Sequence, residues 1–221
     1  MASQFASIEF WQNKFLSFSF SQHTCDSAAE TTGVAIAEAA AIKNENANGR
    51  TGFHKAKNRI EVTHFPFSHN EIRSDSIKEI AEEAVSAAYV QVKEPVFVED
   101  AGLFINALNG FPGTYSAWVQ KKIGCTGILK LMEEIEDRSA EFKSAVSFTD
   151  GKKTHTFEGV CKGSIADREY GSSGFGYDPI FIPQGNSQTF AQNIELKNKL
   201  SHRYTSLLKL SEYLRGVSIS R

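Results

Sequence analysis

A short apolar run that ends in two adjacent carboxylates is the feature that most limits how this chain can fold. Val96, Phe97 and Val98 are followed directly by Glu99 and Asp100. Consecutive apolar residues are typical of a strand buried on both faces, as in α/β proteins. Carboxylates at the end of such a strand are costly unless water, a cation or a metal ion stabilises them. Ligands of open α/β sheets bind at the carboxyl ends of strands, so this position is the first candidate site.

The residues between 60 and 95 predict a strand, a loop and a helix. Ile60–Thr63 is expected to be a short strand that leads into a polar loop over residues 69–75. Ser76 and Glu79 have the spacing of a capping box, in which two side chains satisfy backbone N–H groups at a helix start. Apolar residues then recur at helical spacing, so we expect a helix from about Ser76 to Tyr89.

The second half of the chain predicts a hairpin and a final helix. Apolar and polar residues alternate from Phe142 to Phe148, and Asp150-Gly151 is a typical hairpin turn before a returning strand at 154–160. Residues 171–183 are rich in glycine and aromatic residues without a clear period, so no element is expected there. Leucines at helical spacing between Leu200 and Leu214 predict a closing amphipathic helix. Together these elements indicate an α/β protein.

The first 57 residues differ from the rest of the chain. They are rich in Ser, Ala and Phe and show no clear alternation. The alanine-rich segment Val34–Ile42 favours a helix by propensity, and Ala39–Lys43 makes a poor buried strand. We therefore expect residues 1–57 to be a divergent or extended segment and residues 58–221 to form the folded domain. At most, part of 34–57 supplies the first strand and loop of that domain.

Composition excludes several functional classes. The formal net charge is −2 and the pI about 6.3, which argues against a broad basic surface for nucleic acid. No segment approaches the roughly 20 apolar residues that cross a bilayer, so no membrane partner is expected. Cys25, Cys125 and Cys161 are far apart, which suits small buried side chains in a reducing compartment better than disulfides or a zinc site. The expected location is the cytoplasm.

The first group of candidate residues is acidic and consists of Glu71, Glu99 and Asp100. Mg²⁺ typically takes one or two protein carboxylates and completes its octahedron with water and phosphate oxygens. A further carboxylate can orient or deprotonate an attacking water. The alternative is structural, with Glu71 as a loop carboxylate and Glu99-Asp100 as a strand-end cap. The residues alone leave both interpretations open.

The second group is the segment Gly174-Phe175-Gly176-Tyr177-Asp178-Pro179. Glycines let the backbone approach a ligand closely, and aromatic faces can stack on a base. The Asp178 carboxylate can accept hydrogen bonds from purine ring nitrogens. The alternative is a tight aromatic turn that packs on the core. The glycine spacing fits neither a Walker A loop nor a dinucleotide fingerprint.

The third group is the basic segment from Lys197 to Arg203. Lys197 and Ser201 lie four residues apart, so on one helix they would share a face. Lys197 can act as a point charge on phosphate, and Arg203 can donate to a phosphate or a carbonyl oxygen. The alternative is a solvated basic helix start, and His202 alone is more often a satisfied histidine than a catalyst.

In these three groups the chain resembles the inosine triphosphate pyrophosphatase family, which hydrolyses non-standard purine triphosphates. Three blocks carry the resemblance in the same order: VFVEDAGLFINALNGFPGTYS at 96–116, GFGYDPIFIP at 174–183 and KNKLSHR at 197–203. It extends from about Ile60 to the C-terminus and is strongest to the shorter archaeal members. The resemblance implies an elongated mixed β-sheet flanked by helices, two lobes with a nucleotide cleft between them, and a homodimer.

The resemblance also implies a role for each matching residue. Asp100 would be the general base and a Mg²⁺ ligand, Glu71 the second metal carboxylate, and Glu99 a support for the pair. Phe175, Gly176, Tyr177 and Asp178 would clamp the purine, with Lys197 on the nucleotide and His202 and Arg203 on the 6-keto oxygen. Ala101 stands where the family usually has a serine beside the substrate.

The family's phosphate-binding loop, T/S-x-N-x-x-K, is not matched. Counting back from Ile60 without gaps places its asparagine at Asn44 and its lysine at Ala47. Three explanations stay open: a divergent loop in which Lys43, Lys55 or Lys57 supplies the charge, an extension that has lost the first strand, or an altered reading frame upstream of Lys57. Loss of this lysine would weaken transition-state stabilisation.

The implied reaction is attack by a metal-oriented water on the α-phosphorus of ITP, dITP or XTP, which gives the monophosphate and pyrophosphate and cleanses the nucleotide pool. The principal alternative is a catalytically impaired nucleotide-binding homologue that keeps the base clamp and lacks the lysine loop. Two further alternatives are a pyrophosphatase for modified pyrimidines, which the Ser201-His202-Arg203 segment disfavours, and a nucleic-acid-binding module, which the charge balance disfavours.

Overall fold

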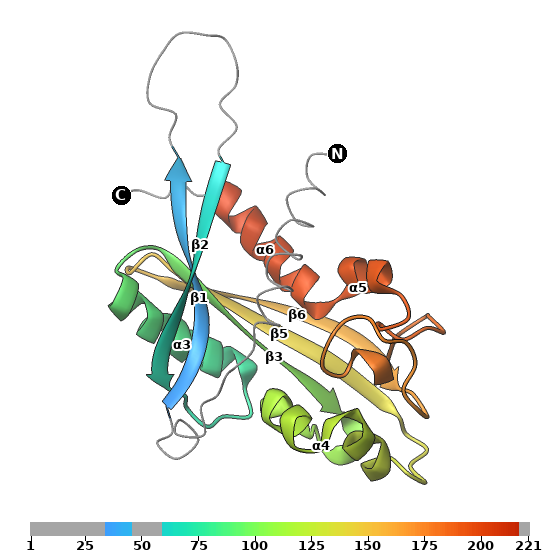
Figure 1. Ribbon diagram of the computed structural model, residues 1–221. Helices are drawn as coiled ribbons and strands as arrows, with labels where there is room; N and C mark the ends of the chain where they lie inside the picture. Colours follow the sequence, from blue (N-terminus) through green and yellow to red (C-terminus); the bar gives the residue numbers. More distant parts are fainter. Residues whose placement is uncertain (1–33, 46–58, 217–221) are drawn as a thin grey trace, which may run out of the picture.

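The computed structural model describes residues 34–45 and 59–216, and Figure 1 shows their arrangement. Seven strands form one sheet in the order β2-β1-β3-β5-β6-β7, and β4 pairs with β3. The strands are β1 (Val34–Glu45), β2 (Arg59–Asn70), β3 (Val96–Ile105), β4 (Pro112–Gly113), β5 (Ser139–Thr149), β6 (Thr154–Ile165) and β7 (Phe181–Pro183). The helices are α3 (Ile77–Val92), α4 (Ser116–Leu131), α5 (Ile194–Leu200) and α6 (His202–Gly216), with 3₁₀ turns η1 (Asn106–Leu108) and η2 (Asp178–Ile180).

The predicted α/β class, an open sheet flanked by helices, is confirmed. The resemblance implies a mixed sheet, but every pair between the described strands is antiparallel. The sheet grows largely from hairpins, such as β5–β6, in which Thr149 pairs with Thr154 across the predicted Asp150-Gly151 turn. A short loop of this kind can join only antiparallel neighbours.

Helices α3 and α6 flank the sheet in Figure 1. Ala84, Val85 and Ala88 of α3 pack with Val96 and Val98 of β3. Leucines of α6 pack on the other face, with Phe97 among their partners. The apolar run of β3 is therefore buried on both sides, as its sequence predicts, and each large side chain withdrawn from water contributes roughly 1.5–3 kcal/mol.

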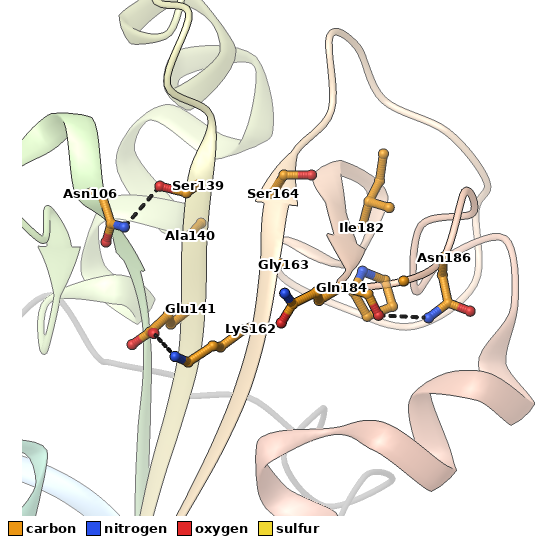
Figure 2. A pocket seen from close by; sticks show the side chains of 12 residues that line it. Asn106, Ser139, Ala140, Glu141, Lys162, Gly163, Ser164, Ile182, Gln184 and Asn186 are labelled. Carbon is orange, nitrogen blue, oxygen red and sulfur yellow. Dashed lines mark hydrogen bonds and ion pairs between the residues drawn. The ribbon is translucent and has the colours of Figure 1, made fainter.

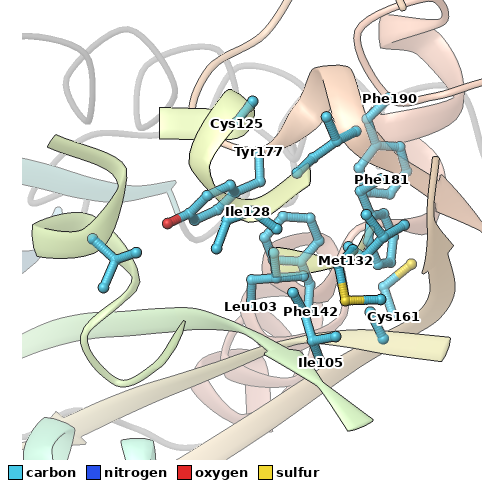
Figure 3. Close-up of a cluster of buried hydrophobic side chains, with 14 residues drawn as sticks. Leu103, Ile105, Cys125, Ile128, Met132, Phe142, Cys161, Tyr177, Phe181 and Phe190 are labelled. Carbon is cyan, nitrogen blue, oxygen red and sulfur yellow. The ribbon is translucent and has the colours of Figure 1, made fainter. Parts of the chain in front are cut away.

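A third apolar cluster fills the end of the molecule beneath α4 (Figure 3). Phe142 of β5 lies at its centre, with ring centroids 4.6 Å from Phe181 and 6.3 Å from Phe190. Met132, which follows α4, and Ile128 within it are fully buried here. This core joins α4 and the segment around η2 to the end of β3, and so it fixes the loop that carries Phe175 and Asp178.

The alanine-rich segment Val34–Ile42 lies in a strand, although its composition favours a helix by propensity. Strand β1 pairs with β2 along its whole length and with β3 at Ala39–Ala41. It therefore includes the Ala39–Lys43 stretch that the sequence disfavours as a buried strand. Two neighbouring strands satisfy the backbone groups of β1, and such tertiary pairing outweighs the helix propensity of alanine.

Three other boundaries differ from the sequence prediction. Strand β2 is longer than Ile60–Thr63 and reaches Asn70, and β6 extends past Val160 to Ile165. The closing helix is divided into α5 and α6 by Ser201, whose backbone is extended at φ −64° and ψ 153°. Lys197 and Ser201 thus do not share one helix face.

The 171–183 segment does contain elements, η2 and β7, because backbone pairing with β6 does not require side-chain periodicity.

The start of α3 agrees with the predicted cap, although the helix ends three residues later than expected. The Ser76 side chain accepts a hydrogen bond from the Glu79 backbone N–H at 3.3 Å. The Glu79 carboxylate accepts from the Ser74 hydroxyl at 2.7 Å instead of from Ser76, so half of the capping box is rearranged.

Cys125 and Cys161 are buried free thiols, as expected, and Cys25 lies outside the described residues. Within the described ranges, no helix is both long and apolar enough to cross a bilayer.

Candidate active site

The middle of β3 has an open edge. On the side away from β5, pairing with β1 ends at Val98 and pairing with β4 begins at Leu103. Among the described strands, none pairs with residues 99–102 on this side. Open backbone groups can bind a ligand, and a ligand at this edge can reach both faces of the sheet. The expected strand end after Val98 is wrong, because β3 continues to Ile105. The two carboxylates do follow directly after the last residue of β3 that pairs with β1.

Glu99 and Asp100 leave β3 on opposite faces, as successive residues of a strand do. Glu99 contacts Arg203 of α6 and Ser144 of β5. Asp100 is the register partner of Ala145, which packs with Ile77 of α3. The acidic residues are thus divided between the two faces of the sheet. Asp100 faces α3, whereas Glu99 faces α6 and contacts Arg203.

Asp100 is an unusually basic carboxylate. Its pKa is raised to about 8, first by burial and then by the negative charges of Glu99 and Glu71, while a backbone hydrogen bond from Ala101 and the charge of Arg203 act in the opposite direction. Its Oδ2 atom is buried and has no hydrogen-bond partner among the described residues. A side chain in this state favours binding a proton or a cation.

Glu71 lies in the loop between β2 and α3 and is exposed. Its charge acts on Asp100, so the two carboxylates lie within electrostatic reach of each other. The loop is tied to the segment after β4, where the Thr114 hydroxyl donates to the Ser74 carbonyl oxygen at 2.8 Å. This hydrogen bond links the loop that carries Glu71 to the end of β3.

These two carboxylates fit a hard divalent cation. In the part of the chain that the structure describes, no group of three or more His, Cys, Asp or Glu side chains is arranged as a metal site. Mg²⁺ needs only one or two protein carboxylates when substrate phosphates and water supply its other ligands. The unpartnered Oδ2 of Asp100 and the exposed carboxylate of Glu71 meet that requirement.

Asp178 and Lys197 form an ion pair in which each side chain is only 3% exposed. The same Asp178 oxygen accepts a hydrogen bond from the Phe175 backbone N–H at 2.7 Å. Burial lowers the pKa of Lys197, and the attraction of Asp178 opposes this shift. Gly174 has φ +79°, and a Cβ atom there would lie 2.2 Å from the Asp178 carboxylate. The glycine therefore permits the turn that places Asp178 under Phe175.

The Phe175 ring lies close to two cationic groups. The Lys197 ammonium is 3.8 Å from the ring centroid and the Arg203 guanidinium carbon is 5.1 Å from it. Cations over an aromatic face are attracted by its negative charge density. The structure thus brings together Phe175, Asp178, Lys197 and Arg203, which the sequence places in two separate segments.

His202 is buried at the first position of α6. Its ring stacks on Phe142 with centroids 4.7 Å apart and an interplanar angle of 12°. Burial, together with the charges of Arg203 and Lys197, holds its pKa well below the usual value, so the imidazole is neutral. Its Nδ1 atom has no partner among the described residues. Ser201, just before it, caps α6 by accepting from the Tyr204 backbone N–H at 3.2 Å.

Tyr177 is buried beneath the loop, whereas Gly176 is partly exposed and has open space where a Cβ atom would lie. The Tyr177 ring belongs to the apolar cluster of Figure 3, and its hydroxyl donates to the Ser116 carbonyl oxygen at 3.0 Å. The Gly176 carbonyl oxygen accepts from the Gln120 side chain at 3.1 Å and from the Cys125 thiol at 3.3 Å. The Tyr177 side chain, which the resemblance places beside the purine, therefore packs in the core cluster, and its contact with a base stays a prediction.

Sequence reasoning missed Gln120, Cys125, Ser144 and Ser206 as supports of this site. Ser144 carried a signal: it lies on the apolar side of the alternating 142–148 strand, where a hydroxyl group needs a buried partner. Ala101 is its register partner and lies on the same face of the sheet. Asn44 lies in β1 opposite Ile60, and its side chain is outside the described set.

A polar groove of about 410 Å³ lies elsewhere, between β5, β6 and the segment after β7 (Figure 2). It contains none of the predicted site residues. Its lining consists of Asn106, Ser139, Ala140, Glu141, Lys162, Gly163, Ser164, Ile182, Pro183, Gln184, Gly185 and Asn186. Lys162 and Glu141 pair across it at 3.8 Å, so its charges already neutralise each other. The open edge of β3, where the predicted site residues gather, is therefore the candidate site.

Comparison with known proteins places these features in context. The model of the Ham1 family matches residues 36–213. A protein of Saccharolobus solfataricus named dITP/XTP pyrophosphatase is 48% identical over 161 residues, which cover 72% of this chain and 84% of the relative. A protein of the same name from Methanopyrus kandleri is 46% identical over 178 residues, which cover 77% and 95%.

Solved structures agree with the sequence comparison. The Ham1 protein of Staphylococcus aureus superimposes with a TM-score of 0.62 and 35% identity over 66% of this chain and 79% of that one. A HAM1 protein of Coxiella burnetii gives a TM-score of 0.61 and 30% identity over 65% and 79%.

Proposed function

The chain belongs to the Ham1 family, and we propose that it hydrolyses the non-standard purine nucleoside triphosphates dITP, ITP and XTP to the monophosphate and pyrophosphate. One observation carries the proposal. A cluster of Phe175, Asp178, Lys197 and Arg203, in which Asp178 and Lys197 are buried, lies on one face of β3. The basic carboxylate of Asp100 leaves the other face at the same open edge. The similarity to proteins named dITP/XTP pyrophosphatase supports the same substrate class.

Base selection follows from the donors on the α6 face. Nε of Arg203 is bound by Glu99, while none of the described residues accepts from its two terminal NH₂ groups. Those groups can donate to a 6-keto oxygen. Opposite the 6-amino group of adenine they would face another donor, and an unpaired buried polar group costs about 1–3 kcal/mol. Hypoxanthine and xanthine are therefore accepted and adenine is disfavoured.

Water activation follows from the state of Asp100. Its buried Oδ2 atom has no hydrogen-bond partner among the described residues, and it can accept a proton from water once a cation holds the carboxylate in its ionised form. We assign it the role of base towards the water that attacks the α-phosphorus, with the proton passing to the carboxylate. Glu71 and Asp100 would hold Mg²⁺, which supplies neutralisation of phosphate charge when it is bound.

The decisive experiment measures pyrophosphate release from ITP, dITP, XTP, ATP and GTP with Mg²⁺, for the wild-type chain and for Asp100→Asn. Fast release from the first three substrates, lost in Asp100→Asn, supports the proposal. Glu71→Gln should raise the Mg²⁺ concentration needed for half-maximal rate. Binding of ITP without any turnover would instead favour an impaired nucleotide-binding homologue, whose phosphate grip is incomplete because Ala47 replaces the lysine of the family motif.

We also propose that the protein is a homodimer. Phe111, Tyr115 and Trp118, near the start of α4, are 40%, 48% and 56% exposed. Closely spaced exposed aromatic residues favour burial against a partner surface. Light scattering after size exclusion should give twice the 24.4 kDa chain mass, and Trp118→Asp should reduce it towards the monomer. A wild-type monomer at micromolar concentration would contradict the proposal.

A cytoplasmic location is proposed as well. The free, buried thiols of Cys125 and Cys161 suit a reducing compartment. Cell fractionation with an antibody against the chain tests this, and recovery in a membrane or secreted fraction would contradict it.

A further inference from the structure

We infer that Ser144 and Ser206 are positioning residues for Arg203: their hydroxyl groups form a relay of hydrogen bonds that holds Glu99 and, through it, the guanidinium group. The inference rests on the proposed function, in which Arg203 reads the base. Neither serine contacts the expected substrate surface, so each acts only through its neighbours.

The first link is a shared oxygen atom. Oε1 of Glu99 accepts from the Ser144 hydroxyl at 2.8 Å and from Nε of Arg203 at 3.0 Å. The Glu99 side chain is only 7% exposed, so water contributes little to holding it. Without Ser144, the described contacts of this carboxylate reduce to the arginine that it is meant to orient.

The second link joins two buried hydroxyl groups. Oγ of Ser144 and Oγ of Ser206 are 2.9 Å apart, and both residues are almost completely buried. Ser206 also lies 3.1 Å from the Arg203 carbonyl oxygen. Two hydroxyl protons serve these three contacts, so the single Ser206 proton is shared between the Arg203 carbonyl oxygen and the Ser144 oxygen. An ionised carboxylate can only accept, so the Ser144 proton points to Glu99, and the Ser144 oxygen is left to accept from Ser206. Hydrogen bonds aligned in this way strengthen one another.

The backbone is shaped for this relay. Gly159 of β6 is the register partner of Ser144. A Cβ atom at Gly159 would lie 2.0 Å from the His202 carbonyl oxygen and 2.8 Å from the Ser206 backbone nitrogen. The first turn of α6 therefore lies directly on the sheet, at a distance that only glycine permits. This close approach lets a serine of the strand reach a serine of the helix.

The relay fixes the orientation of a planar group. A guanidinium bound at Nε keeps its two NH₂ groups directed away from that bond, and the Phe175 ring 5.1 Å away restricts the remaining rotation. Loss of the relay would leave Arg203 in place but allow its plane to turn. Such a change weakens recognition of the base more than it weakens chemistry at the phosphorus.

Buried hydroxyl groups also stabilise folds without serving a site, and Ser147 provides a matched control. It lies on the same strand, is fully buried, and pairs with the Thr156 hydroxyl at 2.9 Å. Ser147→Ala removes an equivalent buried contact on the opposite face of the sheet, where Thr156 in turn donates to Glu82 of α3. Any effect of general loosening should appear in both variants.

The experiment compares Ser144→Ala, Ser206→Ala, the double variant and Ser147→Ala by kcat and KM for ITP and ATP. Ser144→Ala should raise KM for ITP about tenfold with a smaller change in kcat, and should lower the ITP/ATP ratio of kcat/KM. Ser206→Ala should give part of this effect, and the double variant should match Ser144→Ala. Ser144→Thr, which keeps the hydroxyl, should restore the ratio. A ratio unchanged in Ser144→Ala, or lowered equally in Ser147→Ala, would overturn the inference.

A second measurement does not depend on turnover. The Arg203 Nε–H proton should exchange with water slowly in the wild-type protein and in Ser147→Ala, and faster in Ser144→Ala, by NMR. Unchanged exchange in Ser144→Ala would reject the relay whatever the enzyme does. Absence of ITP turnover together with the expected exchange would reject the proposed function and leave the relay intact.

Discussion

Asp178 and Lys197 are nineteen residues apart in the chain and form an ion pair that is almost completely buried beneath the Phe175 ring. Taking two charges out of water is costly, and the pair offsets that cost only while both members are present. The pair therefore ties the loop that carries Phe175 and Asp178 to α5. It also makes either single substitution more harmful than the loss of both charges.

This ion pair predicts non-additive losses of stability in a double-mutant cycle. Asp178→Asn or Lys197→Met alone should cost about 3–5 kcal/mol of unfolding free energy, because each leaves a buried charge unpaired. The double variant should cost less than either single variant, because it leaves no buried charge unpaired. Denaturant unfolding at pH 7 measures all three. Lys143→Ala removes an exposed partner of Glu141 and should cost no more than about 1 kcal/mol. Additive losses would show that the two charges are independent.

Asp100 predicts how stability depends on pH when EDTA removes divalent cations. Its pKa rises from 3.8 to about 8 on folding, so between these values the folded state holds a proton that the unfolded state has lost. The contribution of Asp100 to the free energy of unfolding is therefore greatest below about pH 4. It falls as the pH rises towards about 8, by up to ~1.4 kcal/mol per pH unit.

The measurement is Tm between pH 5 and pH 8.5 for the wild-type chain and for Asp100→Asn. The wild-type Tm should decline relative to that of the variant by at most about 3–6 °C per pH unit, and Mg²⁺ should reduce the difference at pH 8. Parallel curves for the two proteins would show that Asp100 is not held in a protonated state.

A single methyl group added at Gly174 should disturb the position of Asp178 and weaken ITP binding. Gly174→Ala places a Cβ atom 2.2 Å from the Asp178 carboxylate in a residue with φ +79°, so it should both strain the backbone and displace Asp178. Gly185 has the same φ and open space around its Cβ position, so Gly185→Ala carries the backbone strain alone. We expect Gly174→Ala to weaken ITP binding at least tenfold and Gly185→Ala to leave it unchanged, as measured by calorimetry with Ca²⁺ in place of Mg²⁺. Equal binding by both variants would contradict the placement of Asp178.

Arg203 predicts a loss of substrate discrimination. Arg203→Lys keeps the charge but has no planar pair of donors, so kcat/KM for ITP should fall about 10–100-fold and that for ATP much less. Arg215→Lys, at the end of the same helix, serves as the control and should change neither value. A proportional fall for both substrates would mean that Arg203 acts on the phosphates and not on the base.

The sequence by itself determined the elements whose signals are local. The apolar run of β3, the Ser76 cap and the Asp150-Gly151 turn each depend on residues within a few positions, and the structure agrees with them. The α/β class follows from these local patterns. The resemblance to the family depends on three blocks, each of which is an uninterrupted segment of the chain.

Tertiary structure decided what depends on distant neighbours. Strand β1 exists because β2 and β3 supply its hydrogen bonds, against the propensity of its alanines. Neighbouring Glu99 and Asp100 serve different faces because β3 continues past them, and Tyr177 joins the core because α4 covers it. Ser144 acts on Arg203 because Gly159 lets α6 approach the sheet. Pairing, burial and close packing between segments are properties of the folded chain, so no local pattern of residues could specify them.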